Sequence, residues 1–335
     1  MRLTNTLINK DSSCVPIWFM RQAGRYLPEF RKIRSSNKDF IKLCLNSELS
    51  SEITLQPLVR FNLDAAIIFS DILMVPFGLG QEVNFIKNKG PVLSELNIDN
   101  FLNNSEINFS KKLSPVYKAI KETRKKLNKE KSLISFIGSP WTLIIYMLGL
   151  KKAKDVLDQN LLRAKQKEVR LILEKITLFL CAHIKNQVEA GADVVQIFDS
   201  WAGLIPKDRL DEYCIQPNLK IVNFCKDMNV PTICFPRGIK DNYVNFVNLV
   251  KPDGINIDYE VEPEWARKNL GGICIQGGMK PQVLLQDNKK IFKEAERFLK
   301  VFQDYPYIFN LGHGLLPETD PNRVEKLINY IKDFK

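Results

Sequence analysis

Short apolar runs alternate along this chain with longer segments in which apolar positions recur at helical spacing. Short buried runs are typical of strands, and periodic segments are typical of amphipathic helices. We predict strands at Val15–Met20, Ala65–Phe69, Leu133–Ile137, Val194–Phe198, Thr232–Phe235, Gly254–Ile257, Ile273–Ile275 and Tyr307–Asn310. We predict helices at 48–62, 114–129, 161–190, 208–228, 240–250, 288–302 and 321–334.

This alternation predicts parallel strands joined by crossover helices. Roughly eight repeats predict an α/β fold of the closed (β/α)8 TIM-barrel type. An open doubly wound sheet is the alternative, although no GxGxxG follows the first strand. The chain of 335 residues shows no linker, repeat or low-complexity tract, so we predict one domain over residues 1–335.

Two local features refine this prediction. Ser47 and Asp320 precede predicted helices and are good capping residues. One insertion, 76–96, breaks the rhythm after the second strand. It contains an alternating section, Glu82–Ile86, followed by turn residues at 88–90, and therefore predicts a small hairpin.

The chain is basic, with 49 Lys and Arg against 38 Asp and Glu and a net charge of +11. Such a balance favours acidic partners. Much of the excess lies in 111–131, where an apolar stripe runs through the same segment. This indicates the charged outer face of an amphipathic helix more than a nucleic-acid surface, since no zinc-finger, RNP or basic-zipper motif accompanies it.

The seven cysteines form no CxxC pair, which is typical of reduced thiols in a cytoplasmic protein. The two histidines are too few for a His-rich metal site. No stretch approaches the roughly 18 apolar residues of a membrane span, and the first residues lack the apolar core of a secretory signal. We therefore expect neither a membrane nor a nucleic-acid partner.

In TIM barrels the active site is built by the loops that follow the strands. Polar and glycine residues occur at these positions throughout this chain. They are Arg21, Ser70-Asp71, Ser139-Pro140-Trp141, Asp199-Ser200-Trp201, Pro236-Arg237, Asp258, Gly277-Gly278 and Gly312-His313-Gly314. Each has an ordinary structural explanation by itself, and it is their joint placement that indicates a site.

The stretch Ile17–Arg34 places four arginines directly after an apolar run. Arg21 and Arg25 share a face if the segment is helical, and Gly24 permits close backbone approach. Because guanidinium groups grip carboxylates bidentately, the stretch predicts a pocket for a polyanionic small molecule. The alternative is a solvated basic helix start, which suits Arg31 and Arg34 better.

Single polar residues at the other strand ends are ambiguous. Asp71 stands between two apolar runs, and it either caps a helix, pairs with an arginine, or faces N–H donors or a developing cation. His313 lies between glycines that leave its ring open to a cavity. Ser200 is not in a GxSxG elbow, and Tyr146 lies in an apolar run where core packing is usual.

The segment Pro16–Tyr26, PIWFMRQAGRY, closely resembles the N-terminal signature of the uroporphyrinogen decarboxylase family. FSDIL around Asp71, PWTL before Tyr146, FDSWAG around Ser200 and NLGHG around His313 resemble further motifs of that family, in order from Leu7 to Pro321. The chain departs from the family pattern at 148–152, at Tyr259, and at Gly278 and Lys280.

This resemblance implies a homodimeric carboxy-lyase of haem biosynthesis that converts the four acetates of uroporphyrinogen III to methyls, giving coproporphyrinogen III. It implies no cofactor and no metal. Arg21, Arg25 and Asp71 would be catalytic, with Asp71 facing the pyrrole N–H groups. The implied substrate-binding residues are Arg21, Gln22, Ala23, Gly24, Arg25, Asp71, Tyr146, Ser200 and His313.

Two other functions are considered. Corrinoid-type methyltransferases of the same barrel superfamily hold zinc through a His-x-Cys pair and a later cysteine. Here Thr232-Ile233-Cys234 lacks that histidine, and His313 stands near the place of the last cysteine. A noncatalytic binder of nucleic acid or anionic tetrapyrrole would fit the charge but leaves the strand-end motifs unexplained.

Overall fold

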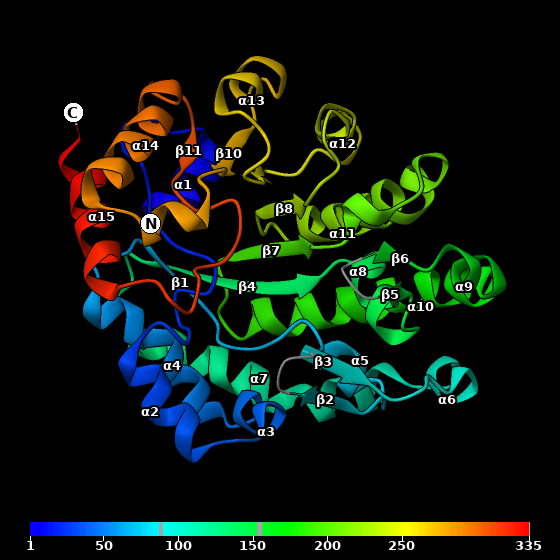
Figure 1. Cartoon of the computed structure of the whole chain (residues 1–335). Coiled ribbons are helices and arrows are strands. Elements are labelled where there is room, and N and C mark those ends of the chain that lie inside the picture. The colour runs from blue at the N-terminus through cyan, green and yellow to red at the C-terminus, as the bar shows by residue number, and fades with distance from the viewer. Residues whose placement is uncertain (87–89, 153–155, 335) are drawn as a thin grey trace.

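The computed structural model describes residues 1–86, 90–152 and 156–334 and shows a parallel seven-stranded sheet curled into a barrel (Figure 1). The strands are β1 (Ala65–Ile67), β4 (Ser132–Gly138), β7 (Val194–Asp199), β8 (Thr232–Pro236), β9 (Gly254–Ile257), β10 (Cys274–Gly277) and β11 (Tyr307–Ile308). They are hydrogen-bonded in chain order, and every neighbouring pair is parallel. The predicted α/β barrel is confirmed.

The eighth position of the barrel is occupied by an irregular segment, residues 16–18. The Trp18 N–H donates to the carbonyl of Phe309 at 3.3 Å, and the carbonyl of Ile17 accepts from the N–H of Asp64 at 2.9 Å. The segment thus joins β11 to the start of β1. The predicted strand Val15–Met20 was wrong in extent, because only Ile17 forms a β-bridge.

The reason is that side chains replace ladder partners in this segment. The Ile17 N–H donates to the carboxylate of Asp64, and the Met20 N–H donates to the side-chain carbonyl of Asn310. The Phe19 N–H likewise donates to the side chain of Gln22.

Helices surround the strands on the outside, apart from α1 (Arg2–Asn9), which lies across one end of the barrel (Figure 1). The others are α2 (Pro28–Ser36), α3 (Phe40–Cys44), α4 (Ser47–Arg60), α5 (Met74–Gly78), α6 (Ile98–Leu102), α7 (Glu106–Lys126), α8 (Pro140–Met147), α9 (Gln159–Ala164), α10 (Gln166–Glu189), α11 (Gln216–Asp227), α12 (Asn242–Val250), α13 (Pro263–Asn269), α14 (Asn288–Val301) and α15 (Pro321–Asp333). Each predicted helical segment contains a helix.

Several helix boundaries differ from the prediction. Helix α7 begins well before residue 114 because Ser105 caps it, and Pro115 is accommodated inside. The predicted segment 161–190 is divided between α9 and α10. Asp320 caps α15 as predicted, whereas α4 is capped by Asn46 instead of Ser47.

One end of the barrel is closed by α1. Leu3 and Leu7 of this helix belong to the same buried cluster as Trp18, Ile134 and Ile308 inside the barrel. A second, larger core lies between the sheet and the outer helices. Helix α1 thus fills the amino-terminal end of the strands, and the cavity lined by residues that follow the strands opens at the opposite, carboxyl end.

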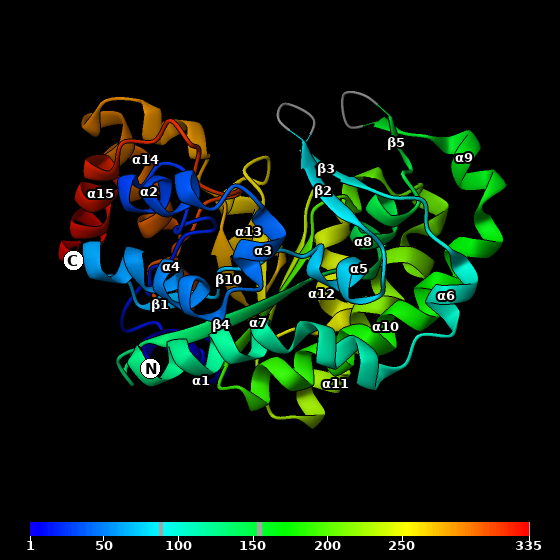
Figure 2. The same cartoon turned by 90° about the horizontal axis from the view of Figure 1, so that it is seen from below.

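Two small antiparallel strand pairs extend from the same side of the barrel (Figure 2). The first, β2 (Val83–Ile86) with β3 (Gly90–Leu93), falls within the predicted insertion 76–96. Its predicted turn residues Asn88 and Lys89 lie outside the described residues. The second pair, β5 (Lys151–Lys152) with β6 (Val156–Leu157), was not predicted.

The seven cysteines all carry free thiols. Within the described ranges, no helix is long and apolar enough to cross a membrane.

Candidate active site

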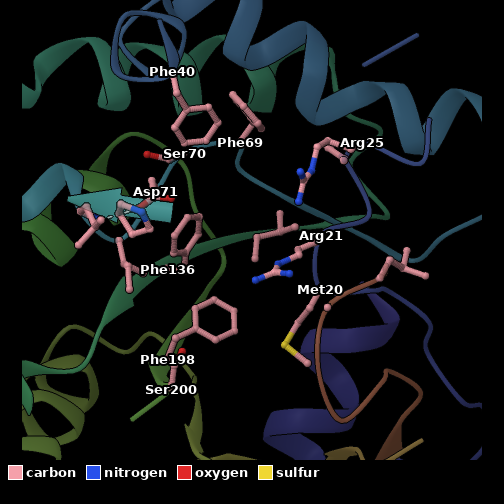
Figure 3. Close-up of a pocket in the computed structure, with 18 of the residues that line it drawn as sticks. Met20, Arg21, Arg25, Phe40, Phe69, Ser70, Asp71, Phe136, Phe198 and Ser200 are labelled. Atoms are coloured by element: carbon pink, nitrogen blue, oxygen red, sulfur yellow. Dashed lines mark hydrogen bonds between the residues drawn. The ribbon is translucent and has the colours of Figure 1, made fainter. Parts of the chain in front are cut away.

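A cavity of about 1000 Å³ opens at the carboxyl ends of the strands. It contains most of the residues that the sequence singled out. The predicted site residues that line it are Arg21, Ala23, Gly24, Arg25, Asp71, Tyr146, Ser200 and His313. Arg21 and Arg25 enter from one side, and Asp71 and Ser200 lie across from them (Figure 3).

Gln22 does not line this cavity. Its side chain is fully buried, where it accepts from the Phe19 N–H at 3.0 Å and donates to the Ala65 carbonyl at 3.1 Å. Its own carbonyl accepts from the hydroxyl of Tyr26. Gln22 therefore holds the loop that carries Arg21 and Arg25 against the barrel.

Four arginines line the cavity: Arg21, Arg25, Arg34 and Arg237. Among the described residues, none of the four forms an ion pair with a carboxylate. Arg34, for which the sequence favoured the alternative of a solvated helix start, lies in the last turn of α2, is half-buried, and has its guanidinium 5.6 Å from the Phe40 ring centroid. Arg31 instead donates to the carbonyls of Arg25 and Tyr26 and so fixes their loop.

The backbone of Arg21 is left-handed, with φ of 61°. This conformation is uncommon outside glycine and is found at sites where the surroundings over-determine it. Gly314 makes room for the side chain, since a Cβ there would lie 2.4 Å from Arg21 Cδ. Burial, followed by the neighbouring charge of Arg25, lowers the pKa of Arg21, although a guanidinium remains charged at neutral pH.

One carboxylate oxygen of Asp71 accepts a hydrogen bond from the backbone of its own loop. Its Oδ1 accepts from the Leu73 N–H at 2.9 Å in the turn before α5, whose N-cap is Leu73 and receives no side-chain cap bond. Burial raises the pKa of Asp71 to about 6, and the Leu73 N–H and Arg21 oppose that rise. At neutral pH this is an anion in a cavity wall, and no arginine among the described residues forms an ion pair with it.

The loop carrying Ser200 is fixed by helix α8. The Trp201 N–H donates to Thr142 Oγ1 at 3.1 Å, and that hydroxyl donates to buried Asp199 at 2.7 Å. Trp141 Nε1 donates to the Trp201 carbonyl at 3.0 Å. Since α8 also carries Tyr146, the same helix positions both polar side chains on this wall.

His313 is a neutral hydrogen-bond donor in this structure. Burial lowers its pKa to about 4, and Arg21 and Arg237 act in the same direction. Nδ1 accepts from the Gly314 N–H at 2.6 Å. The ring proton therefore resides on Nε2, where it can donate to a carboxylate.

Aromatic rings complete the cavity wall. Phe40, Phe69 and Phe85 meet edge to face, with Phe40 centroids 5.8 Å from Phe69 and 4.6 Å from Phe85. Phe136 of β4 and Phe198 of β7 meet at 5.7 Å and are half-buried on otherwise buried strands. The arrangement supplies apolar surface for a flat ring system with charges at its edge. We did not predict this aromatic wall, because the sequence of an apolar strand does not show which of its side chains point into the cavity.

The described residues contain no group of three or more His, Cys, Asp or Glu side chains that could hold a metal ion. Cys234 of β8 is fully enclosed, and burial raises the pKa of its thiol well above the usual value. A thiolate ligand is therefore disfavoured at this position.

Comparison with known proteins gives consistent results. The family described as "Uroporphyrinogen decarboxylase (URO-D)" matches residues 1–334. Uroporphyrinogen decarboxylase of Orientia tsutsugamushi (strain Ikeda) is 40% identical over 333 residues, covering 97% of this chain and 96% of that protein. The Rickettsia bellii (strain RML369-C) protein of the same name is 39% identical, covering 100% and 99%.

Among solved structures, a methyltransferase from Methanosarcina mazei superposes with a TM-score of 0.79, covering 99% of this chain and 98% of that one. At 17% identity this likeness concerns the fold alone. The sequence matches extend over nearly the whole chain and include the segments that line the cavity, so the protein belongs to the uroporphyrinogen decarboxylase family.

Proposed function

We propose that this protein removes the four acetate carboxyls of uroporphyrinogen III as carbon dioxide and releases coproporphyrinogen III. The observation that carries the proposal is one cavity lined by four arginines, by the Asp71 carboxylate and by an aromatic wall, with no ion pair to those arginines among the described residues. Uroporphyrinogen carries an acetate and a propionate on each pyrrole, so it is a flat apolar system with eight carboxylates at its edge. The cavity complements it in both charge and surface.

Decarboxylation leaves an electron pair that needs a sink, and the pyrrole itself provides one. Protonation at a pyrrole carbon makes that ring cationic. The C–C bond to the acetate carboxyl then breaks, its electrons neutralise the ring, and carbon dioxide leaves. A second proton then adds to the exocyclic methylene carbon and gives the methyl group, and loss of the first proton from the ring carbon restores the neutral pyrrole. The protein therefore has to bind carboxylates, stabilise a transient cation and exclude water.

Asp71 suits the stabilisation of the cation. Its Oδ1 is held by the Leu73 N–H, so the carboxylate is oriented before substrate arrives. The ionised form carries the negative charge that a cationic pyrrole requires. Arg21 and Arg25 face Asp71 across the cavity and would bind the acidic groups of the reacting pyrrole (Figure 3). Tyr146, Ser200 and His313 would bind carboxylates at the edge.

Three further properties form part of the proposal. The chain acts as one domain over residues 1–335, it works in the cytoplasm without a cofactor, and two copies pair with their cavities facing each other. Analytical ultracentrifugation of the purified protein tests the last point, and a monomer at all concentrations would contradict it.

The decisive experiment is anaerobic incubation with uroporphyrinogen III, with carbon dioxide and coproporphyrinogen III measured together. We expect four carbon dioxide molecules per coproporphyrinogen formed. The matched control is Asp208→Asn, which removes an exposed carboxylate outside the cavity and should leave the rate unchanged. A properly folded protein that releases no carbon dioxide would overturn the proposal.

A further inference from the structure

Arg237 is separated from the other cavity arginines by half of the barrel. Arg21, Arg25 and Arg34 all come from one stretch of chain, which follows the closing segment 16–18. Around the ring of strands, β8 lies four positions from that segment in either direction. Among the described residues that line the cavity, Arg237 is therefore the one cation supplied by the far half.

The backbone of Arg237 is fixed on both sides. Its N–H donates to the carbonyl of Asp199 at 3.1 Å, and its own carbonyl accepts from the Gly203 N–H at 2.9 Å. The next N–H, that of Gly238, donates to Asp258 Oδ2 at 2.8 Å. Gly203 and Gly238 also pack closely, since a Cβ on Gly203 would lie 3.0 Å from the Gly238 carbonyl oxygen. The arginine consequently projects from a rigid base.

The side chain, in contrast, has little to bind. Arg237 Nη2 donates to the Tyr259 hydroxyl at 3.3 Å, and the guanidinium lies 5.8 Å from that ring. No ion pair to Arg237 is found in the described part of the chain. The nearby carboxylate of Asp258 already accepts from the N–H groups of Gly238 and Glu260 and from the Tyr243 hydroxyl. A guanidinium has five N–H donors, so most of these remain available.

We propose that Arg237, aimed by Tyr259, holds a propionate of the substrate on the side of the cavity opposite the reacting pyrrole. The inference rests on the proposed function and adds a binding contact to it. Because each pyrrole must react in turn, the ring opposite carries an acetate in some rounds and a methyl in others. Only its propionate is present in every round. A fixed cation that serves all four decarboxylations must therefore bind that group.

The test is Arg237→Gln, which keeps polarity and removes the charged fork. Loss of a charge-assisted bidentate contact weakens binding by about tenfold to a hundredfold. We expect KM for uroporphyrinogen III to rise within that range while kcat stays within about threefold. Inhibition by coproporphyrinogen III, which keeps the propionates and lacks the acetates, should weaken by the same factor.

Two further variants should raise KM by smaller amounts than Arg237→Gln does. Arg237→Lys keeps the charge without the planar fork, so it should fall between Arg237→Gln and the natural enzyme. Tyr259→Phe should raise KM by only a few fold, because it removes one long hydrogen bond and keeps the ring. The matched control is Lys280→Gln, since Lys280 lies 5.7 Å from the same ring, is exposed, and does not line the cavity. It should leave KM unchanged.

The outcomes separate this inference from the proposed function. If the natural enzyme releases no carbon dioxide, the function fails first. If it is active and folded Arg237→Gln keeps its KM, or loses kcat alone, then Arg237 does not bind substrate as proposed. If KM for uroporphyrinogen rises while coproporphyrinogen inhibition is unchanged, the residue binds acetate and the propionate assignment is overturned. Should Arg237→Gln fail to fold, Arg237→Lys answers the same questions.

Discussion

Asp71→Asn should nearly abolish turnover and should also stabilise the folded protein. The substitution keeps size and keeps an oxygen for the Leu73 N–H, but it removes the negative charge. That charge matters most when the pyrrole is cationic, so the loss falls on the transition state. Removing one preorganised electrostatic contact costs about 2.7–4 kcal/mol, on the order of 10²–10³ in kcat.

The stability gain follows from the raised pKa. The pKa of Asp71 is about 6 in the folded protein against an ordinary 3.8, a difference of about two units or about 3 kcal/mol. Because the folded protein binds this proton more tightly than the unfolded chain does, the protonated Asp71 side chain contributes to the free energy of unfolding. That contribution is fully present below about pH 4 and is lost as the pH rises through about 6. Asparagine has no charge to bury at any pH, so the variant avoids this loss. At pH 8 we therefore expect its Tm to be about 4 °C higher for a chain of this size.

The assay combines kcat with thermal melting of both proteins at pH 5, 6 and 8. We expect the Tm difference at pH 5 to be about half of its value at pH 8, because the natural carboxylate is then mostly protonated. Asp208→Asn serves as the control for loss of an exposed carboxylate, with its side chain 77% exposed. If Asp71 were only a helix cap, asparagine would replace it well, and a folded variant keeping more than about a third of kcat would refute the catalytic assignment.

Three other predictions concern the arginines and the absence of a cofactor. Arg21→Lys and Arg25→Lys should each lower kcat/KM by at least about tenfold, because an ammonium cannot replace the bidentate fork of a guanidinium. Arg31→Lys should be milder, because Arg31 binds backbone carbonyls. Near-normal kinetics in both the Arg21 and the Arg25 variant would place these two arginines outside the site. Gly314→Ala should lower kcat/KM by about tenfold, because the added Cβ displaces the Arg21 side chain. The control is Gly271→Ala, which has open space around it and should leave kcat/KM unchanged. Equal kcat/KM for the two variants would show that the position of Arg21 is not critical. Dialysis against a strong chelator should leave activity intact, and a loss restored only by zinc would favour the methyltransferase alternative.

The repeating pattern of the chain was sufficient to predict the barrel and the position of its active-site cavity. Period-2 and helical spacings are local properties, and parallel strands bring all their carboxyl ends to one edge. For this reason, residues as distant in sequence as Asp71, Ser200 and His313 were expected to lie together, and they line one cavity. The motifs that resemble the uroporphyrinogen decarboxylase family contain the same residues.

Other features depended on contacts between distant segments. The first strand is reduced to a bridge at Ile17 because side chains of Asp64 and Asn310 occupy its N–H groups. Arg34 lines the cavity with its guanidinium over the ring of Phe40, and Gln22 is turned inward by its bond to Ala65. None of these orientations is encoded by spacing along the chain.

The electrostatics of the site also belong to the tertiary structure. The raised pKa of Asp71 and the lowered pKa of His313 arise from burial and from charges on other elements. Likewise, only the closed ring of strands places Arg237 opposite Arg21. The sequence determined which residues stand at the strand ends, because that is a matter of local periodicity. Their protonation, pairing and mutual orientation were decided by packing, because desolvation and Coulomb interactions depend on distances that exist only after the chain has folded.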